Sequence, residues 1–399
     1  MFTALIFITL LAGATPYHYH CSRGSTLKLL KRPIYEFSLN ILDRISQETG
    51  GHFVFSPLSS WLQLVTLAEG ATGSTSMEIW KVTRHHRIKC FQRQLQNILN
   101  SMSNELNAYS KRTNVIIIDN FYKVKNEFKN NVEKFNGVKV ISLDFREPII
   151  AAEEANTLIE SYMGGTITDV VYPSDFNFTV LLLTDVTYFK NDWKYPFNRA
   201  YSTIQPFYSE QGKRIGEVKM MNQIAYFNLV KVPSINAMVL EIPCSADDRV
   251  VLLVLLPIRG TVSDIFFSLQ SIRLMTIFNL YKRTGLQLVN VHLPRFKIIS
   301  DVDSLPELMY DMGIKSVFYP NLANLTRISQ YGVYASLMSQ IADIEVVEEG
   351  ITANFVAEYL VVNKKTTKFV VDRPFAFLVV DKVTEIILFA GSYNSPSVY

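Results

Sequence analysis

The spacing of apolar residues divides the chain into a helical first half and a strand-rich second half. In the first half, helical periodicity predicts helices over 33–49, 56–70, 84–109 and 150–162, and an apolar run near 114–124 predicts a strand. From residue 180 onward, apolar runs predict strands, which helices interrupt near 262–281 and 303–312. The strand ranges are 180–190, 225–232, 237–242, 250–257, 287–299, 341–347, 368–380 and 385–393. Helices followed by many strands are typical of an α+β fold with large antiparallel sheets.

Two of these elements carry further signals. Ser56 followed by Pro57 is a typical helix start, because serine caps free N–H groups and proline fits the first turn. The apolar run from Val250 to Leu256 predicts a buried central strand.

The composition predicts a large folded core and few charged partners. The chain has 399 residues, of which 48% are hydrophobic and 19% charged, a balance that excludes disorder. The net charge of +3 is too small to attract nucleic acid over the whole surface, so nucleic acid is not an expected partner. No segment after the N-terminus has the roughly 18 uninterrupted apolar residues of a membrane-spanning helix, so no membrane partner is expected.

The first residues have the pattern of a secretory signal peptide. An apolar run over residues 2–11 ends in Ala12-Gly13-Ala14, a small-x-small cleavage pattern. We therefore expect a signal peptide over 1–14, a mature chain from Thr15 and a secreted, extracellular protein. The alternatives are a buried N-terminal strand or a short anchor.

The cysteines and two sequons suit an extracellular protein. Cys21, Cys90 and Cys244 are an odd number, so a secreted monomer keeps a free thiol or pairs one between chains. Asn177 and Asn324 each begin an Asn-x-Thr sequon, which predicts two glycosylation sites.

The sequence contains no motif of an enzyme. Metalloprotease, nucleophile-elbow, phosphate-loop and Cys-x-x-Cys motifs are absent. His85-His86 beside Cys90 is expected to be a solvated surface pair rather than a metal site, because adjacent histidines point to different faces. His18, His20 and Cys21 are expected to lie in a frayed tail, with adventitious copper or zinc chelation as the alternative. We therefore expect no catalytic activity, no metal and no cofactor.

A series of short blocks resembles the serpin family over essentially the whole mature chain. Their order and spacing are similar to those of a diverged secreted serpin of the insect type. The blocks are HFVFSPLS (52–59), EGATGST (69–75), TYFKNDW (187–193) with Phe197, KMM (219–221), VLEIP (239–243), LPRF (293–296), MGI (312–314), EEG (348–350), RPFAFL (373–378) and ILFAG (387–391).

The resemblance implies both a fold and a mechanism. The fold would be one serpin domain over 15–399, with three β-sheets, eight to nine helices and an exposed reactive-centre loop at about 348–368. A serine protease cuts this loop and forms an acyl-enzyme with it. The loop then inserts into the main sheet and distorts the protease, so that the protease is trapped. The expected partner is an extracellular, trypsin-like serine protease, and the expected state is a monomer.

The position of the cut follows from the same resemblance. Glu348-Glu349-Gly350 resembles the hinge of the loop, and counting on from Gly350 places the scissile residue near Lys364. Counting back from Pro374 places it at Asn363, because this loop is one residue short. Lys364 or Lys365 would suit a trypsin-like protease, whose pocket carries a buried carboxylate. The alternative is that both lysines form a solvated loop tip.

The hinge departs from the inhibitory pattern of the family. Insertion would bury alternate side chains, among them Ile351, Ala353 and Phe355. Inhibitory serpins place small residues here, and overpacking a tight interior costs about 1–3 kcal/mol per site. Slow insertion would release the protease. A non-inhibitory serpin that acts as a substrate-like, binding or carrier protein is therefore the alternative function.

The resemblance also implies a set of residues around the sheet-opening region. Asp185 and Gln340 replace the usual asparagine and histidine, and we expect their side chains to bond beneath Ser56 and Ser59. Arg295 should pair with Glu348, and Trp193 should pack nearby or serve as ordinary core.

A basic segment lies where some serpins bind heparin. It contains His85, His86 and the basic residues Arg84, Arg87, Lys89 and Arg93. The expected ligand is a heparin-like glycosaminoglycan, and the alternative is a solvated helix face.

Overall fold

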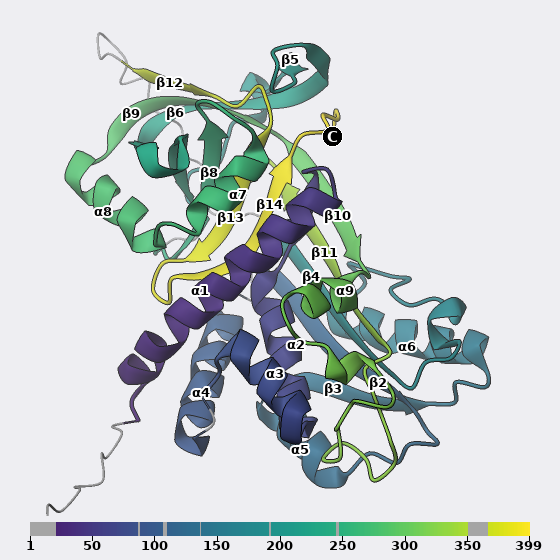
Figure 1. Cartoon of the computed structure of the whole chain (residues 1–399). Coiled ribbons are helices and arrows are strands. Elements are labelled where there is room, and N and C mark those ends of the chain that lie inside the picture. The colour runs from purple at the N-terminus through teal and green to yellow at the C-terminus, as the bar shows by residue number, and fades with distance from the viewer. Residues whose placement is uncertain are drawn as a thin grey trace, which may run out of the picture.

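The structure of the protein is a computed structural model (Figure 1). It describes residues 21–86, 88–106, 110–135, 137–190, 193–244, 247–349 and 366–399. The expected signal peptide and residues 350–365 lie outside the described residues, as does Arg87. The expected site residues Gly350, Ile351, Ala353, Phe355, Lys364 and Lys365 therefore stay predictions.

The described residues form nine α-helices, and side-chain caps mark where several begin. Ser22 caps the first helix together with Ser25, and Ser56 caps the second by accepting from the Ser59 amide at 3.4 Å. The expected Ser56-Pro57 start is therefore confirmed. The helices are α1 (Arg23–Glu48), α2 (Pro57–Gly70), α3 (Gly73–Thr83), α4 (Lys89–Leu106), α5 (Asn126–Phe135), α6 (Pro148–Met163), α7 (Val262–Leu269), α8 (Leu274–Thr284) and α9 (Leu305–Asp311).

Fourteen strands form the sheets of the described chain. They are β1 (Phe53–Phe55), β2 (Ser110–Asp119), β3 (Val138–Leu143), β4 (Leu181–Lys190), β5 (Thr203–Tyr208), β6 (Arg214–Val232), β7 (Ala237–Pro243), β8 (Val250–Pro257), β9 (Gln287–Pro294), β10 (Phe296–Val302), β11 (Leu337–Val346), β12 (Thr367–Val370), β13 (Phe375–Asp381) and β14 (Ile386–Tyr393). Four short 3₁₀ helices complete the elements: η1 (Pro173–Phe176), η2 (Arg199–Tyr201), η3 (Pro233–Ile235) and η4 (Ser316–Phe318).

The strands form a five-stranded sheet and a nine-stranded sheet. The first has the order β10-β11-β4-β2-β3, and the second has the order β1-β14-β13-β8-β7-β6-β9-β12 with β5 paired to β6. The long strand β6 pairs with β7 at one end and with β5 and β9 at the other, so the nine strands are two sub-sheets joined by β6. Counted this way, the α+β fold with three sheets is confirmed, and β8 is central as expected.

The core lies on both sides of the five-stranded sheet. Helix α2 packs against β4 and β14, so it lies between the two sheets, and all its residues but Glu69 are buried. Helix α6 covers the opposite face of the five-stranded sheet, where a second apolar cluster lies (Figure 1). Strands β1 and β14 approach closely at Gly391, where a Cβ would lie 2.1 Å from the Phe53 carbonyl oxygen.

Several predicted boundaries are wrong. The helix predicted from residue 33 begins ten residues earlier, at Arg23, and holds Pro33 in its interior. Pro33 has no N–H to donate to the Leu29 carbonyl, so the helix lacks this one bond of its ladder. Helices α3 and α5 and strand β3 were not predicted. The predicted ranges 287–299 and 368–380 each contain two strands. In the first range the chain passes from β9 in one sheet to β10 in the other, and in the second it passes from β12 to β13 at another position of the same sheet.

None of the helices in the described ranges is long and apolar enough to cross a membrane.

Candidate functional site

The candidate site is the seam between two parallel strands of the five-stranded sheet, called the β4–β11 seam below. Its register runs from Leu182 opposite Leu337 to Lys190 opposite Glu345. The outer neighbours, β2 and β10, are antiparallel to β4 and β11 respectively. Strand β11 ends two residues before Glu348, so the expected hinge leaves directly from the end of the seam that holds Lys190 and Glu345. This end is called the upper end below.

Gln340 fastens the middle of the seam to the start of α2. Its amide oxygen accepts from the Ser56 backbone N–H at 2.6 Å. Its amide nitrogen donates to the Ser56 carbonyl at 3.0 Å and to the Ser60 hydroxyl at 3.2 Å. The Ser56 hydroxyl in turn donates to the Leu388 carbonyl at 2.7 Å, so one glutamine links β11, α2 and β14.

Asp185 is completely buried beside Gln340, and its bonds go to β2. Its Oδ2 accepts from Nε of Arg112 at 3.0 Å and from Nδ2 of Asn114 at 3.3 Å. Burial raises the pKa of Asp185, whereas Arg112 and Ser59 oppose this shift. The ion pair with Arg112 therefore offsets part of the cost of placing a carboxylate at this buried position.

The hydrogen bond expected between Asp185 and Gln340 is not among those of the described residues. The two residues are register partners on β4 and β11, yet Gln340 directs its amide to α2 and the bound oxygen of Asp185, Oδ2, faces β2. Ser56 and Ser60 already provide one donor and two acceptors for the Gln340 side chain. Its amide therefore has hydrogen-bond partners without the Asp185 carboxylate.

The expected ion pair between Arg295 and Glu348 is present at the upper end of the seam. Glu348 is 1% exposed, and its Oε2 lies 3.4 Å from NH1 of Arg295. Its Oε1 accepts from the Ser202 hydroxyl at 2.8 Å, and its carbonyl accepts from the Phe197 N–H at 3.0 Å. Glu349, beside it, pairs with Arg199. The first hinge residue is thus held by side-chain and backbone contacts.

Trp193 binds the chain on either side of Glu348. Its indole N–H donates to the Val347 carbonyl at 2.6 Å, and its backbone N–H donates to the Glu349 carbonyl at 3.4 Å. The side chain is fully buried and packs edge-on against Phe197. Trp193 is therefore core and hinge contact at once.

Polar bonds also cross the seam on the face toward α6. The Ser339 hydroxyl donates to the Thr184 hydroxyl at 3.1 Å, and the Tyr188 hydroxyl donates to Glu345 at 3.1 Å. Lys190 of β4 lies 3.3 Å from the same carboxylate of β11. Opening the seam would break these bonds.

Sequence reasoning did not find several partners of the predicted residues. Their positions are set by sheet order and by the segment after Trp193, and a single sequence carries little trace of either. The only sequence signal was the polar residues preceding the predicted strand near 114–124. The missed partners are Ser60, Arg112, Asn114, Arg199 and Ser202, and the Tyr188–Glu345 bond across the seam was missed as well.

The expected polyanion patch lies around the end of α3 and the start of α4. Arg84 ends α3 in a left-handed conformation and pairs with Glu36 of α1. Lys89 and Arg93 are exposed on α4. The positive charge of Arg84 is therefore partly neutralised by Glu36, and Arg84 would attract a polyanion less than the sequence predicted.

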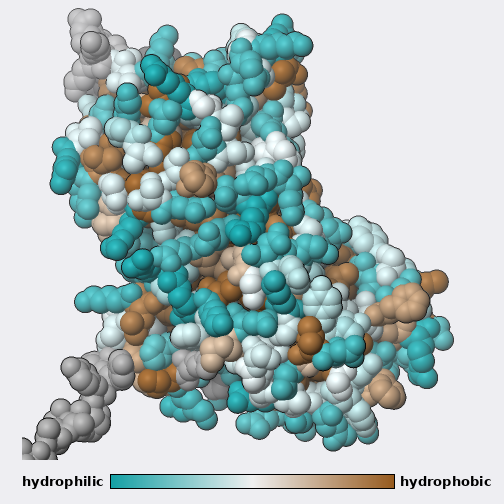
Figure 2. Space-filling model, in the orientation of Figure 1, coloured by the Kyte–Doolittle hydropathy of each residue, from teal (hydrophilic) through white to brown (hydrophobic). Residues whose placement is uncertain are grey.

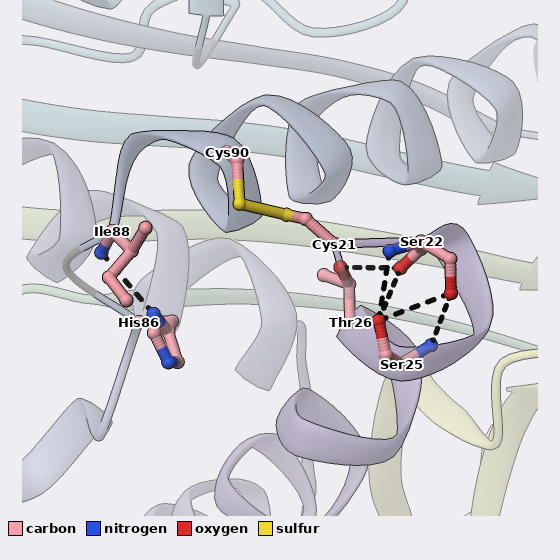
Figure 3. The surroundings of a disulfide bond; sticks show 7 residues. All are labelled: Cys21, Ser22, Ser25, Thr26, His86, Ile88 and Cys90. Atoms are coloured by element: carbon pink, nitrogen blue, oxygen red, sulfur yellow. Dashed lines mark hydrogen bonds between the residues drawn. A yellow bond between two sulfur atoms is a disulfide. The ribbon is translucent and has the colours of Figure 1, made fainter. Parts of the chain in front are cut away.

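A disulfide joins Cys21, just before α1, to Cys90 in the first turn of α4, with the Cα atoms 6.1 Å apart (Figure 3). Cys244 is buried and does not take part in this disulfide. Two of the three cysteines thus pair within the chain.

The expectation that His85 and His86 form a solvated pair is wrong. His85 is buried and shares a 2.6 Å hydrogen bond with the Thr83 hydroxyl, and the His86 ring packs on Phe91 at 4.2 Å. The chain turns at Arg84, just after α3, and both rings then contact neighbouring residues instead of pointing into solvent. No cluster of metal-binding side chains occurs within the described ranges.

The two sequons differ in their surroundings. Asn177 is exposed at the end of η1. Asn324 is half-buried, and its amide oxygen accepts from the Thr72 hydroxyl at 2.6 Å and from Thr326 at 3.1 Å.

Comparisons with known proteins agree with this geometry. The model of the family "Serpin (serine protease inhibitor)" matches residues 33–396. Neuroserpin of Rattus norvegicus is 28% identical over 91% of this chain and 91% of its own length. Leukocyte elastase inhibitor of Xenopus tropicalis is 28% identical over 90% and 97%. The structure of native protease nexin-1 with heparin has a TM-score of 0.81 at 23% identity and covers 93% of this chain and all of the other. The chain belongs to the serpin family of serine protease inhibitors.

Proposed function

We propose that this protein inhibits a trypsin-like serine protease by covalent trapping at or near Lys364. The observation that carries the proposal is the β4–β11 seam, a parallel pairing next to the hinge. A chain that turns back after Glu348 runs antiparallel to β11 and, because β4 is parallel to β11, antiparallel to β4 as well. One inserted strand would thus replace a parallel pairing by two antiparallel ones, which are slightly more stable per residue.

The length of the loop supports insertion. Strand β11 has 10 residues, and residues 350–363 exceed this number. A strand that starts at the hinge could therefore run along the whole seam before it reaches Lys364. The cut end would arrive at the lower end of the seam, far from where it started.

Trapping needs one chemical step. The protease serine oxygen attacks the carbonyl carbon of the residue before the cut, the peptide C–N bond breaks, and the serine proton passes to the leaving amine. An ester then links protease and inhibitor. Insertion that is faster than attack by water keeps this ester intact.

A non-inhibitory serpin, acting as a substrate-like, binding or carrier protein, is the second candidate function. The bulk of Ile351 and Phe355 favours it, as do the polar bonds across the seam that insertion must break. Slow opening would let water hydrolyse the ester before the loop is buried.

The remaining features support an extracellular setting. A disulfide is typical of secreted proteins, in agreement with a signal peptide over 1–14 and one serpin domain over 15–399. Glycosylation would be favoured at the exposed Asn177 over Asn324. On the face that Figure 2 draws, hydrophobic residues are scattered among hydrophilic ones, which supports a monomer. Lys89 and Arg93 would contribute to a heparin-like polyanion site.

The test is incubation with trypsin, followed by a denaturing gel. We expect a band near the sum of the two masses, and we expect Lys364→Ala to lose it. Lys365→Ala is the matched control for the neighbouring bond. Clean cleavage with full protease activity would instead favour the non-inhibitory alternative, and a thermal scan of the cleaved chain would report whether the loop had inserted.

A further inference from the structure

The segment after β14, residues 394–399, is anchored to the protein at several points. Nδ1 of His52 accepts from the backbone N–H groups of Asn394 at 3.3 Å and Ser395 at 3.2 Å. The Asn394 amide donates to the Gly50 carbonyl at 2.5 Å. These bonds fix the start of the segment beside β1.

The middle of the segment crosses the start of β6. The Ser397 N–H donates to the hydroxyl of Tyr393 at 2.9 Å. Pro396 covers Gly216 so closely that a Cβ there would lie 2.7 Å from the proline ring. The chain end in Figure 1 accordingly lies beside the upper part of β10.

Tyr399 covers the cation that holds the hinge. The Arg295 guanidinium carbon lies 5.0 Å from the centre of the Tyr399 ring, within cation–π range. NH1 of the same guanidinium lies 3.4 Å from Oε2 of Glu348. Burial and the neighbouring Glu345 carboxylate raise the pKa of Tyr399, so its phenol remains neutral beside these charges.

We infer that Tyr399 is a positioning residue of the hinge, which acts through Arg295 to hold Glu348 and so slows entry of the loop into the β4–β11 seam. This inference rests on the proposed function, because it assumes that the loop inserts. The ring limits water at Arg295, whose side chain is 21% exposed, and fixes the plane of the guanidinium. An ion pair with less water around it is stronger, and an oriented guanidinium loses less entropy on pairing.

The experiment measures how fast the intact protein takes up a synthetic peptide of residues 350–363 as an added strand, followed on native gels. We expect Tyr399→Ala to take it up about three- to tenfold faster, the factor that corresponds to a cation–π contact. Tyr399→Phe keeps the ring and loses only the hydroxyl that bonds to Glu345, so its rate should stay much closer to that of the parent than the rate of Tyr399→Ala. Val398→Ala, at a neighbouring position that is 60% exposed, is the matched control and should leave the rate unchanged.

A second variant separates positioning from general loosening. If Tyr399 acts through Arg295, Tyr399→Ala should add nothing to the rate of Arg295→Ala. Equal rates for Tyr399→Ala and the parent, or additive effects of the two substitutions, would overturn the inference. If the parent takes up no peptide and gains no thermal stability after cleavage near Lys364, insertion itself fails, and the proposed function fails with it. A parent that gains stability while Tyr399→Ala has no effect overturns the inference alone.

Discussion

The middle and the upper end of the β4–β11 seam are held by different chemistry. In the middle, Gln340 and Asp185 are fully buried, and their partners are backbone groups, a serine, an amide and one arginine. At the upper end, two ion pairs dominate, and the Lys190–Glu345 pair is the more open one: the Lys190 side chain is 41% exposed, against 28% for Arg112 in the middle and 21% for Arg295.

This difference suggests an order of opening. The Lys190–Glu345 pair lies near solvent, so it contributes about 0–1 kcal/mol and weakens with salt, whereas removing the cation from a buried carboxylate such as Asp185 leaves an uncompensated charge. The upper end should therefore yield first and respond to salt, and the middle should set the larger barrier. The following predictions test this contrast, from the largest expected effect to the smallest.

The strongest test is Arg112→Ala, which leaves the buried Asp185 carboxylate without its cation. We expect the free energy of unfolding to fall by about 3 kcal/mol, as measured by urea denaturation. The double variant Arg112→Ala/Asp185→Asn removes the charge as well and should recover most of the loss. Full stability of the single variant would contradict a strongly held middle.

Gln340→Ala should cost about 2 kcal/mol of unfolding free energy, because it leaves the buried Ser56 N–H without a partner and removes one of the donors to the Ser56 carbonyl. The loss should be independent of salt, since no charge is involved. Gln211→Ala, at an exposed position, is the matched control and should have little effect. A salt-dependent loss of stability in Gln340→Ala would mean that the middle and the upper end of the seam are not held by different chemistry.

Tyr188→Phe removes one bond across the upper end of the seam and should cost about 1 kcal/mol. Tyr162→Phe, on an exposed part of α6, serves as the control. If Tyr188→Phe destabilised the protein as much as Gln340→Ala, the upper end of the seam would not be held more weakly than the middle.

The smallest effect concerns pH and the anchor of residues 394–399. Burial lowers the pKa of His52 below its ordinary value near 6.5, so the folded state favours the neutral ring. The stabilisation is present above pH 6.5 and is lost as the pH falls through the folded pKa, because the unfolded chain binds the proton more readily. We expect Tm to fall by about 2 °C or less between pH 7.5 and 5.5 from this group.

His52→Asn is the control for this pH effect, because an amide oxygen still accepts hydrogen bonds but does not titrate. This variant should show a smaller fall in Tm than the parent. His86 and His292, whose pKa values are also lowered by burial, keep their own share of the pH dependence. An unchanged fall in His52→Asn would contradict the assignment.

The sequence predicted the fold well where signals are local or where family blocks recur. Ser56 marks the start of α2, the run 250–256 forms a central strand, and the resemblance led to the Arg295–Glu348 pair. The start of α1 was missed because a proline inside a helix has the same local signal as a proline that begins one.

The bonding of the seam could not be predicted in the same way. Asp185 was expected to bond with Gln340 because the two replace the usual asparagine and histidine of the family, yet Arg112 and Asn114 on β2 bind its Oδ2. Which donor binds the carboxylate depends on the distances between three strands. Likewise, three cysteines allow three pairings, and only the docking of α1 on α4 selects Cys21 with Cys90.

The Cys21–Cys90 disulfide has a consequence for how the protein is prepared. It spans 69 positions, and closing a loop of this length removes enough disorder from the unfolded chain to be worth about 4 kcal/mol. Protein made in a reducing cytosol, or stored with thiol reductants, would therefore be a markedly weaker species than protein exported through an oxidising compartment. Measurements of seam opening on such material would describe a molecule whose α4 is no longer tied to the chain just before α1.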